Sequence, residues 1–208
     1  MPKPSHFKID KMKIIRIATK QLLNNPPTSV INNINRRVEA SKKRFLRSFE
    51  QHPITKEIAA GPDAKNSSLT LGGYGNLFSF LGFNAGSSPL EVVREFIQNI
   101  QVSQKPTSKI VGDGEIHYSF DIFAPFSKED LFDKTQLEWL GKSWLKGIES
   151  GLSGLGYYLF FPDGSDYESR SEMAVQSQRN KIRSLTYRPT KYFSSLLWSF
   201  QMDLNRIK

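Results

Sequence analysis

The sequence predicts an α+β fold in which an antiparallel sheet packs with a long N-terminal helix, a middle helix and a C-terminal helix. Apolar residues recur at 3.6-residue spacing from Val30 to Phe49 and again from Phe193 to Ile207, as in helices with one buried face. Between these segments, apolar and polar residues alternate around Gly112-Asp113-Gly114, which is the pattern of a hairpin. With 38% hydrophobic and 12% aromatic residues, the chain of 208 residues can bury a core.

The N-terminal segment is predicted to be separate from the main domain. Residues 1–28 are expected to form an arm or extension, and residues 29–208 a single domain. Within the arm, residues 12–23 fit either a short helix or a strand. Pro26-Pro27 ends that element, because consecutive prolines remove backbone donors and disfavour the helical conformation of the residue before them.

A long helix is predicted after the two prolines, with Thr28 or Ser29 as its N-cap and His52-Pro53 at its end. Its apolar stripe consists of Val30, Ile31, Ile34, Val38, Phe45, Leu46 and Phe49. The other side of this helix is cationic. On a helical wheel, Arg36, Lys43 and Arg47 lie opposite the stripe, and Arg37 and Arg44 lie to one side.

The segment from residue 54 to residue 125 is predicted to mix short helices with strands. Residues 54–60 fit a helical turn, and the glycines of LTLGGYGNLFSFLGF, at residues 69–83, indicate a turn that feeds a strand or hairpin. Residues 89–99 have the pattern of a helix that begins at Pro89. The hairpin follows at residues 101–125.

The last third of the chain is predicted to contain two helices with strands between them. The first helix runs from Lys134 or Thr135 to Ser150, and the second follows Thr190 as its N-cap. Between them the pattern predicts a buried strand at residues 157–161, a loop at 165–172 and a weak strand at 173–188.

Composition excludes several classes of site. The chain has no cysteine, so disulfides, thiolate metal sites and cysteine nucleophiles are excluded. Its three histidines, His6, His52 and His117, lack the i,i+4 spacing of a helical metal site, and no G-x-S-x-G string is present. We therefore expect no enzymatic activity, no cofactor, no metal and no small-molecule substrate. No apolar run approaches the roughly 18 residues of a membrane span, so no membrane partner is expected.

Two segments resemble ligand loops but lack their defining residues. The glycine string at residues 72–82 has neither the lysine nor the hydroxyl of a P-loop, so a structural turn is the better interpretation. Asp163, Ser165, Asp166 and Glu168 gather oxygens as calcium loops do, but Ala174 stands where the bidentate glutamate would be. A solvated acidic turn is expected there.

The net charge of +9 is unevenly distributed along the chain. Residues 1–60 hold thirteen Lys and Arg against four Asp and Glu, residues 61–169 hold eight against fourteen, and residues 170–208 hold eight against two. Basic ends and an acidic middle can attract a second copy or another charged neighbour, because complementary patches steer encounter and fix register. Ordinary solvated faces are the alternative interpretation.

Three apolar side chains lie off the stripes of their predicted helices. Trp139 lies about 140° from Trp144 on the wheel, and Trp198 with Met202 lies opposite Phe200. Trp and Met are enriched in the cores of protein interfaces, so Trp139, Trp198 and Met202 are candidate partner contacts. The alternative is that another element of the same domain covers them.

Four strings carry a family resemblance. They are HPITKEIAAGP after the basic helix, LGGYGNLFSFLGF, LEWLGKSWLKGIESGLSGLGYYL, and RPTKYFSSLLWSF after a basic strand. Together they resemble the tail-completion or neck proteins of tailed bacteriophages, also called head–tail connector or tail-terminator proteins. The likeness runs from about residue 30 to residue 205.

The resemblance implies an α+β subunit of a homo-oligomeric ring at the head–tail junction, between the portal-side connector and the tail. It implies a virion location, with host cytoplasm during assembly, and other neck, tail or portal-connector proteins as partners. Head-to-tail packing suits the charge blocks, with the off-stripe residues as apolar contacts and the basic helix facing acidic neighbours or genomic DNA in the lumen.

The alternative function is a nucleic-acid-binding protein. It would set the basic helix against phosphates, with the side chains of Arg36, Arg37, Lys42, Lys43, Arg44 and Arg47.

Overall fold

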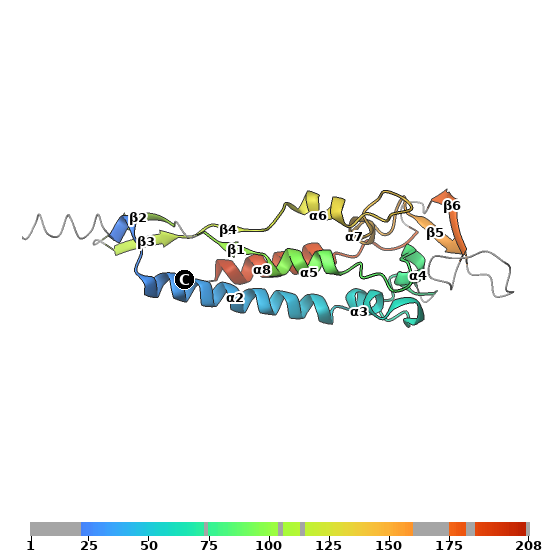
Figure 1. Cartoon of the computed structure of the whole chain (residues 1–208), viewed down its shortest axis with the longest axis horizontal. Helices are drawn as coiled ribbons and strands as arrows, with labels where there is room; N and C mark the ends of the chain where they lie inside the picture. Colours follow the sequence, from blue (N-terminus) through green and yellow to red (C-terminus); the bar gives the residue numbers. More distant parts are fainter. Residues whose placement is uncertain are drawn as a thin grey trace, which may run out of the picture. The chain divides into compact units, whose positions relative to one another are not determined.

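The computed structural model describes residues 22–72, 75–103, 106–112, 115–159, 175–181 and 186–206, and Figure 1 shows their helices and strands. The chain divides into two compact units, one of residues 1–38 and 101–123 and the other of residues 39–100 and 124–208. The described residues combine helices with antiparallel strand pairs, so the predicted α+β class is confirmed. The arm and single domain stay predictions, and residues 1–21 lie outside the described residues.

The first unit contains the predicted hairpin. β2 (Thr107–Val111) pairs antiparallel with β3 (Glu115–Ser119), and β1 (Gln101–Val102) pairs antiparallel with β4 (Ile122–Phe123). The hydroxyls of Ser108 and Tyr118 donate to the carbonyls of Leu23 and Leu22 at 2.6 and 2.7 Å, and so attach the hairpin to the segment before the long helix.

The long helix is confirmed as α2 (Thr28–Gln51). Thr28 is already its first residue, one or two residues before the start that an N-cap at Thr28 or Ser29 would give. The carbonyl of Pro27 accepts the first helical bonds, from the backbone N–H groups of Val30 and Ile31. The prediction of Thr28 or Ser29 as N-cap is therefore wrong. The helix ends before His52 and Pro53, as predicted.

The core of the second unit forms where the C-terminal half of α2 meets α8 (Phe193–Asn205) (Figure 1). The ring centroid of Phe45 lies 5.0 Å from that of Phe200 and 5.9 Å from that of Phe193. Phe96 of α5 (Glu91–Gln98) lies 5.6 Å from Phe193 and joins the same cluster. All of these side chains are at most 5% exposed, so the apolar stripes predicted for the three helices meet in one core.

The glycine-rich string does not form the predicted strand or hairpin. It forms the short helix α4 (Leu77–Leu81), in which the side chain of Asn76 accepts from the backbone N–H of Ser79 at 2.9 Å. Gly82 ends the helix at φ 73°, a left-handed conformation that favours glycine. The prediction was wrong because five residues are too few to show a helical period, and the capping contacts decide the structure instead.

The predicted helix from Lys134 or Thr135 to Ser150 forms only in its last part, as α7 (Trp144–Glu149), which ends at Ser150 as predicted. Its predicted start is wrong, because a separate helix, α6 (Lys128–Lys134), ends there and a turn follows. The hydroxyls of Thr135 and Ser143 share a hydrogen bond of 2.8 Å across the intervening turn, and Ser143 also accepts from the backbone N–H of Lys146 to cap α7. α6 begins with a capping box between Ser127 and Asp130, an S-x-x-D pattern that the sequence analysis overlooked.

The remaining elements follow the predictions more closely. The predicted helical turn at residues 54–60 is α3 (Pro53–Ala59), followed by a 3-10 turn, η1 (Gly61–Asp63), and the predicted strands include β5 (Gly156–Leu159) and β6 (Val175–Lys181), which pair antiparallel. The predicted loop at residues 165–172 and the acidic turn at 163–168 lie outside the described residues. In the described part of the chain, no helix combines the length and apolarity needed to cross a membrane.

α8 is capped by a distant carboxylate instead of by Thr190. Its N-cap residue is Tyr192, whose side chain makes no cap hydrogen bond. Oε1 of Glu149, at the end of α7, accepts from both the backbone N–H and the hydroxyl of Ser194 at 2.6 Å. A carboxylate near a helix N-terminus is favourable, so this contact joins α7 to α8.

Glu57 on α3 holds the start of α4. The residue is 1% exposed, and its two carboxylate oxygens accept from the backbone N–H groups of Ser68 and Leu77 at 2.8 Å each. A buried N–H group costs free energy unless it finds an acceptor. The Glu57 carboxylate therefore provides that acceptor for one backbone N–H in each of two separate segments.

We expect Glu57→Gln to lower the free energy of unfolding by about 1–3 kcal/mol, because an amide NH₂ cannot accept a hydrogen bond and leaves one buried N–H unsatisfied. Urea denaturation of the purified chain measures the change. The matched control is Glu95→Gln on the exposed side of α5, which should change the free energy by less than about 0.5 kcal/mol. Equal effects of the two substitutions would contradict the role of Glu57.

His52 joins α2 to α3 and is a neutral cap. Its Nδ1 accepts from the backbone N–H of Ile54 at 3.2 Å, and its ring centroid lies 4.6 Å from that of Tyr192. Burial lowers the pKa of His52 below its ordinary value of 6.5. Protonation would remove the acceptor and place a positive charge at the N-terminus of α3.

The stability of the chain should therefore fall as the pH drops below about 6.5, because the unfolded chain then binds a proton that folded His52 resists. The loss should continue until the pH reaches the lowered pKa of the folded state. His52→Asn keeps a good N-cap side chain that does not titrate, so the slope of unfolding free energy between pH 7 and pH 5 should decrease. An unchanged slope would show that other groups cause the pH dependence.

Candidate functional site

The outer face of α8 carries the candidate site. Phe193 and Phe200 turn one side of the helix into the core, while Trp198 is 60% exposed. Met202 follows Trp198 by four residues, so the two share a helix face, and Met202 is half-buried. The structure thus places this pair where the wheel predicts, and their role in binding stays a prediction.

An ion pair fixes the end of α8 against α2. Nε of Arg44 lies 2.8 Å from Oδ2 of Asp203, and its Nη2 donates to the hydroxyl of Ser41 at 2.8 Å. Both charged side chains are partly exposed, so the pair is worth no more than about 1 kcal/mol. The ion pair mainly makes Arg44 less available to other molecules. Arg44 is predicted to contact a partner protein, but its guanidinium already binds Asp203 and Ser41 within the chain.

Trp139 lies in a setting unlike the one predicted. It belongs to the turn between α6 and α7 and not to a helix, so the wheel argument for its exposure does not apply. Its indole Nε1–H donates to the carbonyl of Leu81 at 3.0 Å, and the side chain is half-buried. The contact favours the alternative interpretation for Trp139, in which another element of the chain covers it.

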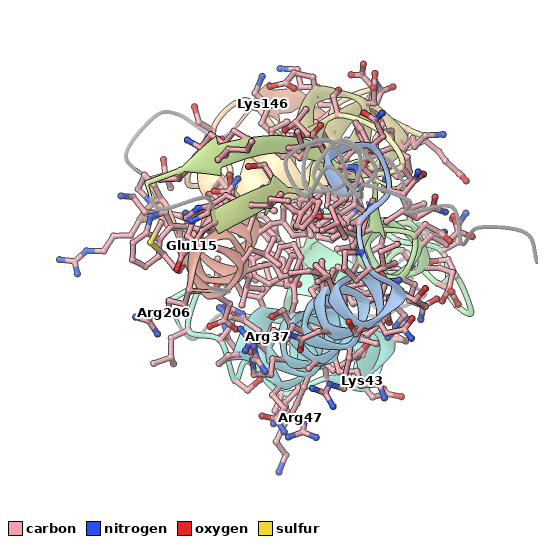
Figure 2. The ribbon with its side chains drawn as sticks, turned by 90° about the vertical axis from the view of Figure 1, so that its left-hand side faces the viewer. Arg37, Lys43, Arg47, Glu115, Lys146 and Arg206 are labelled. Carbon is pink, nitrogen blue, oxygen red and sulfur yellow. The ribbon has the colours of Figure 1, made fainter. Side chains whose placement is uncertain are left out.

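Two of the predicted cations of α2 point to solvent in the second unit. Lys43 and Arg47 are exposed, have no hydrogen bond or ion pair to any described residue, and project outward from the helix in Figure 2. Lys42, in contrast, pairs with Glu39 at 2.8 Å. The cations available to a ligand in this unit are therefore fewer than the sequence indicates.

Arg36 and Arg37 belong to the part of α2 in the first unit. The Nη2 of Arg36 donates to the side-chain oxygen of Asn33 at 3.3 Å, and Arg37 also has an interaction within the chain. Both side chains are exposed, and Figure 2 shows Arg37 on the helix. The bond of Arg36 to Asn33 uses one of the five N–H donors that a guanidinium carries.

A hollow that the sequence analysis did not predict lies between α6 and α7. Its volume is about 440 Å³, and residues of the non-helical turn between the two helices form part of its lining. Phe132 and Leu155 give it apolar surface, and it is also lined by Glu129, Asp133, Lys142 and Lys146. At Gly147, also in its lining, an added Cβ would clash with Cδ1 of Leu155, so a larger residue there would force that buried side chain to shift.

The shifted pKa values of the second unit have structural causes. Hydrogen bonds with Ser127 lower the pKa of Asp130, and the hydrogen bond with Glu50 raises the pKa of Arg94. Burial raises the pKa of Tyr192, whose hydroxyl is bonded to that of Thr55. Each of these groups is engaged in a cap, an ion pair or a core contact, so none is a candidate for acid–base chemistry.

Comparison with known proteins finds no family model, curated protein or solved structure that matches the chain. Over the ranges that the structure describes, no group of three or more His, Asp and Glu side chains could hold a metal ion. The candidate binding surfaces are those of α2, α6, α7 and α8.

Aromatic substitutions on the two faces of α8 should have different effects on the free energy of unfolding. Phe200→Ala should lower the free energy of unfolding by about 3–5 kcal/mol because it opens a cavity beside Phe45. Trp198→Ala should change it by less than about 0.5 kcal/mol, because a mostly exposed side chain makes few core contacts. Urea denaturation at low protein concentration measures both. A loss of several kcal/mol for Trp198→Ala would identify Trp198 as a core residue.

Proposed function

We propose that the chain is a non-enzymatic structural subunit that self-associates through the outer face of α8. The observation that carries the proposal is Trp198, a large apolar side chain that is 60% exposed beside Met202 on a helix whose other face is buried. Buried aromatic contacts dominate many interfaces and are worth about 2 kcal/mol or more when truncated.

The way α8 is held supports an interface on its outer face. Glu149 binds its N-terminus through Ser194, Asp203 binds Arg44 near its C-terminus, and Phe193 and Phe200 pack on Phe45 of α2. A surface that is already ordered loses less conformational freedom on binding, so more of the contact energy appears as affinity.

The resemblance of the four sequence strings to neck proteins indicates where this self-association would take place. We propose a homo-oligomeric ring at the head–tail junction of a tailed bacteriophage, the neck or tail-completion position, which joins the portal-side connector to the tail. Other neck, tail and connector proteins would be its partners in the virion, and genomic DNA would pass through the lumen. Assembly would take place in the host cytoplasm.

A second candidate function is nucleic-acid binding. Lys43 and Arg47 favour it, because both are exposed and neither has a partner among the described residues. Such binding would weaken steeply with salt, since each neutralised phosphate releases counterions. A chain that stays monomeric and retards DNA with a steep salt slope would favour this candidate over the ring.

We expect the purified chain to form oligomers whose mass rises with concentration, visible by light scattering and as annuli in electron micrographs. Trp198→Ala should raise the dissociation constant at least tenfold, which corresponds to about 1.4 kcal/mol, without unfolding the subunit. Ser48→Ala, on the exposed side of α2, is the control and should leave the mass unchanged. A wild-type chain that is monomeric at high concentration would contradict the proposed function.

A further inference from the structure

We propose that the hollow between α6 and α7 is the receptor for Trp198 of a second copy of this chain. The inference rests on the proposed self-association and adds which surface meets α8. One copy would present Trp198, and the next would receive it between Phe132 and Leu155. Both surfaces lie in the second unit, so each subunit carries one of each.

The hollow has the size and lining that an indole needs. Its volume of about 440 Å³ falls in the range of pockets that hold compact ligands, roughly 300–1,000 Å³. Phe132 is half-buried and offers apolar surface, while Leu155 is 2% exposed and adds little. An edge or offset contact with the Phe132 ring is favourable for an aromatic guest. A buried indole also needs an acceptor for its N–H, and the carboxylates of Glu129 and Asp133 are available in the same lining.

The cations of the hollow add a second attraction. Lys146 is exposed, has no partner among the described residues and projects at the surface in Figure 2. An ammonium group over an indole face is a favourable cation–π contact. Lys142 is already engaged, because its Nζ donates to the carbonyl of Gly154 at 3.0 Å.

Charges around the two surfaces are complementary and favour a second copy as the occupant. Arg206 follows Met202 by four residues, is exposed and points away from the body of the molecule in Figure 2, and Lys191 is exposed just before α8. Glu129 and Asp133 on α6 are exposed, and neither has a hydrogen bond or ion pair to another described residue. The basic ends of α8 would therefore meet the acidic side of the hollow. Such complementary charges attract the two subunits and also fix the register in which they pack.

The geometry of this contact is head-to-tail, because α8 and the hollow are different surfaces of the same chain. Contacts of this heterologous kind build a ring when the rotation between subunits closes and an open filament when it does not. Each subunit in the interior of such an assembly uses its Trp198 once and its hollow once.

Two variants test the contact, since each removes a different half of it. Trp198→Ala removes the inserted side chain, and Glu129→Lys with Asp133→Lys reverses the acidic side of the hollow while leaving Asp130 in its capping box. Each variant alone should raise the dissociation constant at least tenfold. Mixed in equal amounts, they should form a 1:1 dimer, because the first still has an intact hollow and the second an intact Trp198.

Light scattering and sedimentation of the separate and mixed variants measure this complementation, with circular dichroism to confirm folding. Glu95→Lys on α5 is the control, and it should assemble like the wild type. A mixture that stays monomeric, or a hollow variant that assembles normally, would overturn the receptor role of the hollow. If the wild type still self-associates in that case, the proposed function remains intact. A wild-type chain that never associates would overturn both.

Discussion

The docking of α8 onto the C-terminal half of α2 is the contact on which the second unit depends. Phe45 stacks on Phe200 at 5.0 Å, and Phe193 lies within 6 Å of both Phe45 and Phe96. Each buried aromatic side chain contributes about 1.5–3 kcal/mol, and here three helices distant in sequence share the same rings. Their apolar faces therefore become buried together, which makes the unit cooperative.

This docking also decides which polar groups are available to other molecules. Once α8 lies on α2, Asp203 reaches Arg44 and Ser194 reaches Glu149, so charges that appear free in the sequence are satisfied internally. Of the side chains that the sequence singled out in this unit, Trp198 on α8 and Lys43 and Arg47 on α2 stay exposed, and Met202 is half-buried. The mixed lining of the hollow adds a further surface. These surfaces favour a subunit that binds other proteins through shape and charge.

Sequence patterns predicted the long elements well and the short ones poorly. α2 and α8 extend over several turns, so their stripes are unambiguous, and the hairpin of β2 and β3 is marked by alternation around its glycine turn. α4, α6 and α7 have five to seven residues, too few for a period. Their bounds come from single hydrogen bonds, those of Asn76, Ser127 and Ser143, of which only the S-x-x-D string of α6 leaves a recognisable signal.

The sequence by itself determined the α+β class and the buried faces of α2 and α8, because both depend on local periodicity, whereas it left open whether another element covers Trp198. Only the tertiary structure decided that Trp139 binds the carbonyl of Leu81, that Arg44 pairs with Asp203, and that a hollow lies between α6 and α7. Each of these depends on residues far apart in the chain or on where a helix breaks. Helical periodicity describes one element at a time and carries no information about which distant atoms will meet it.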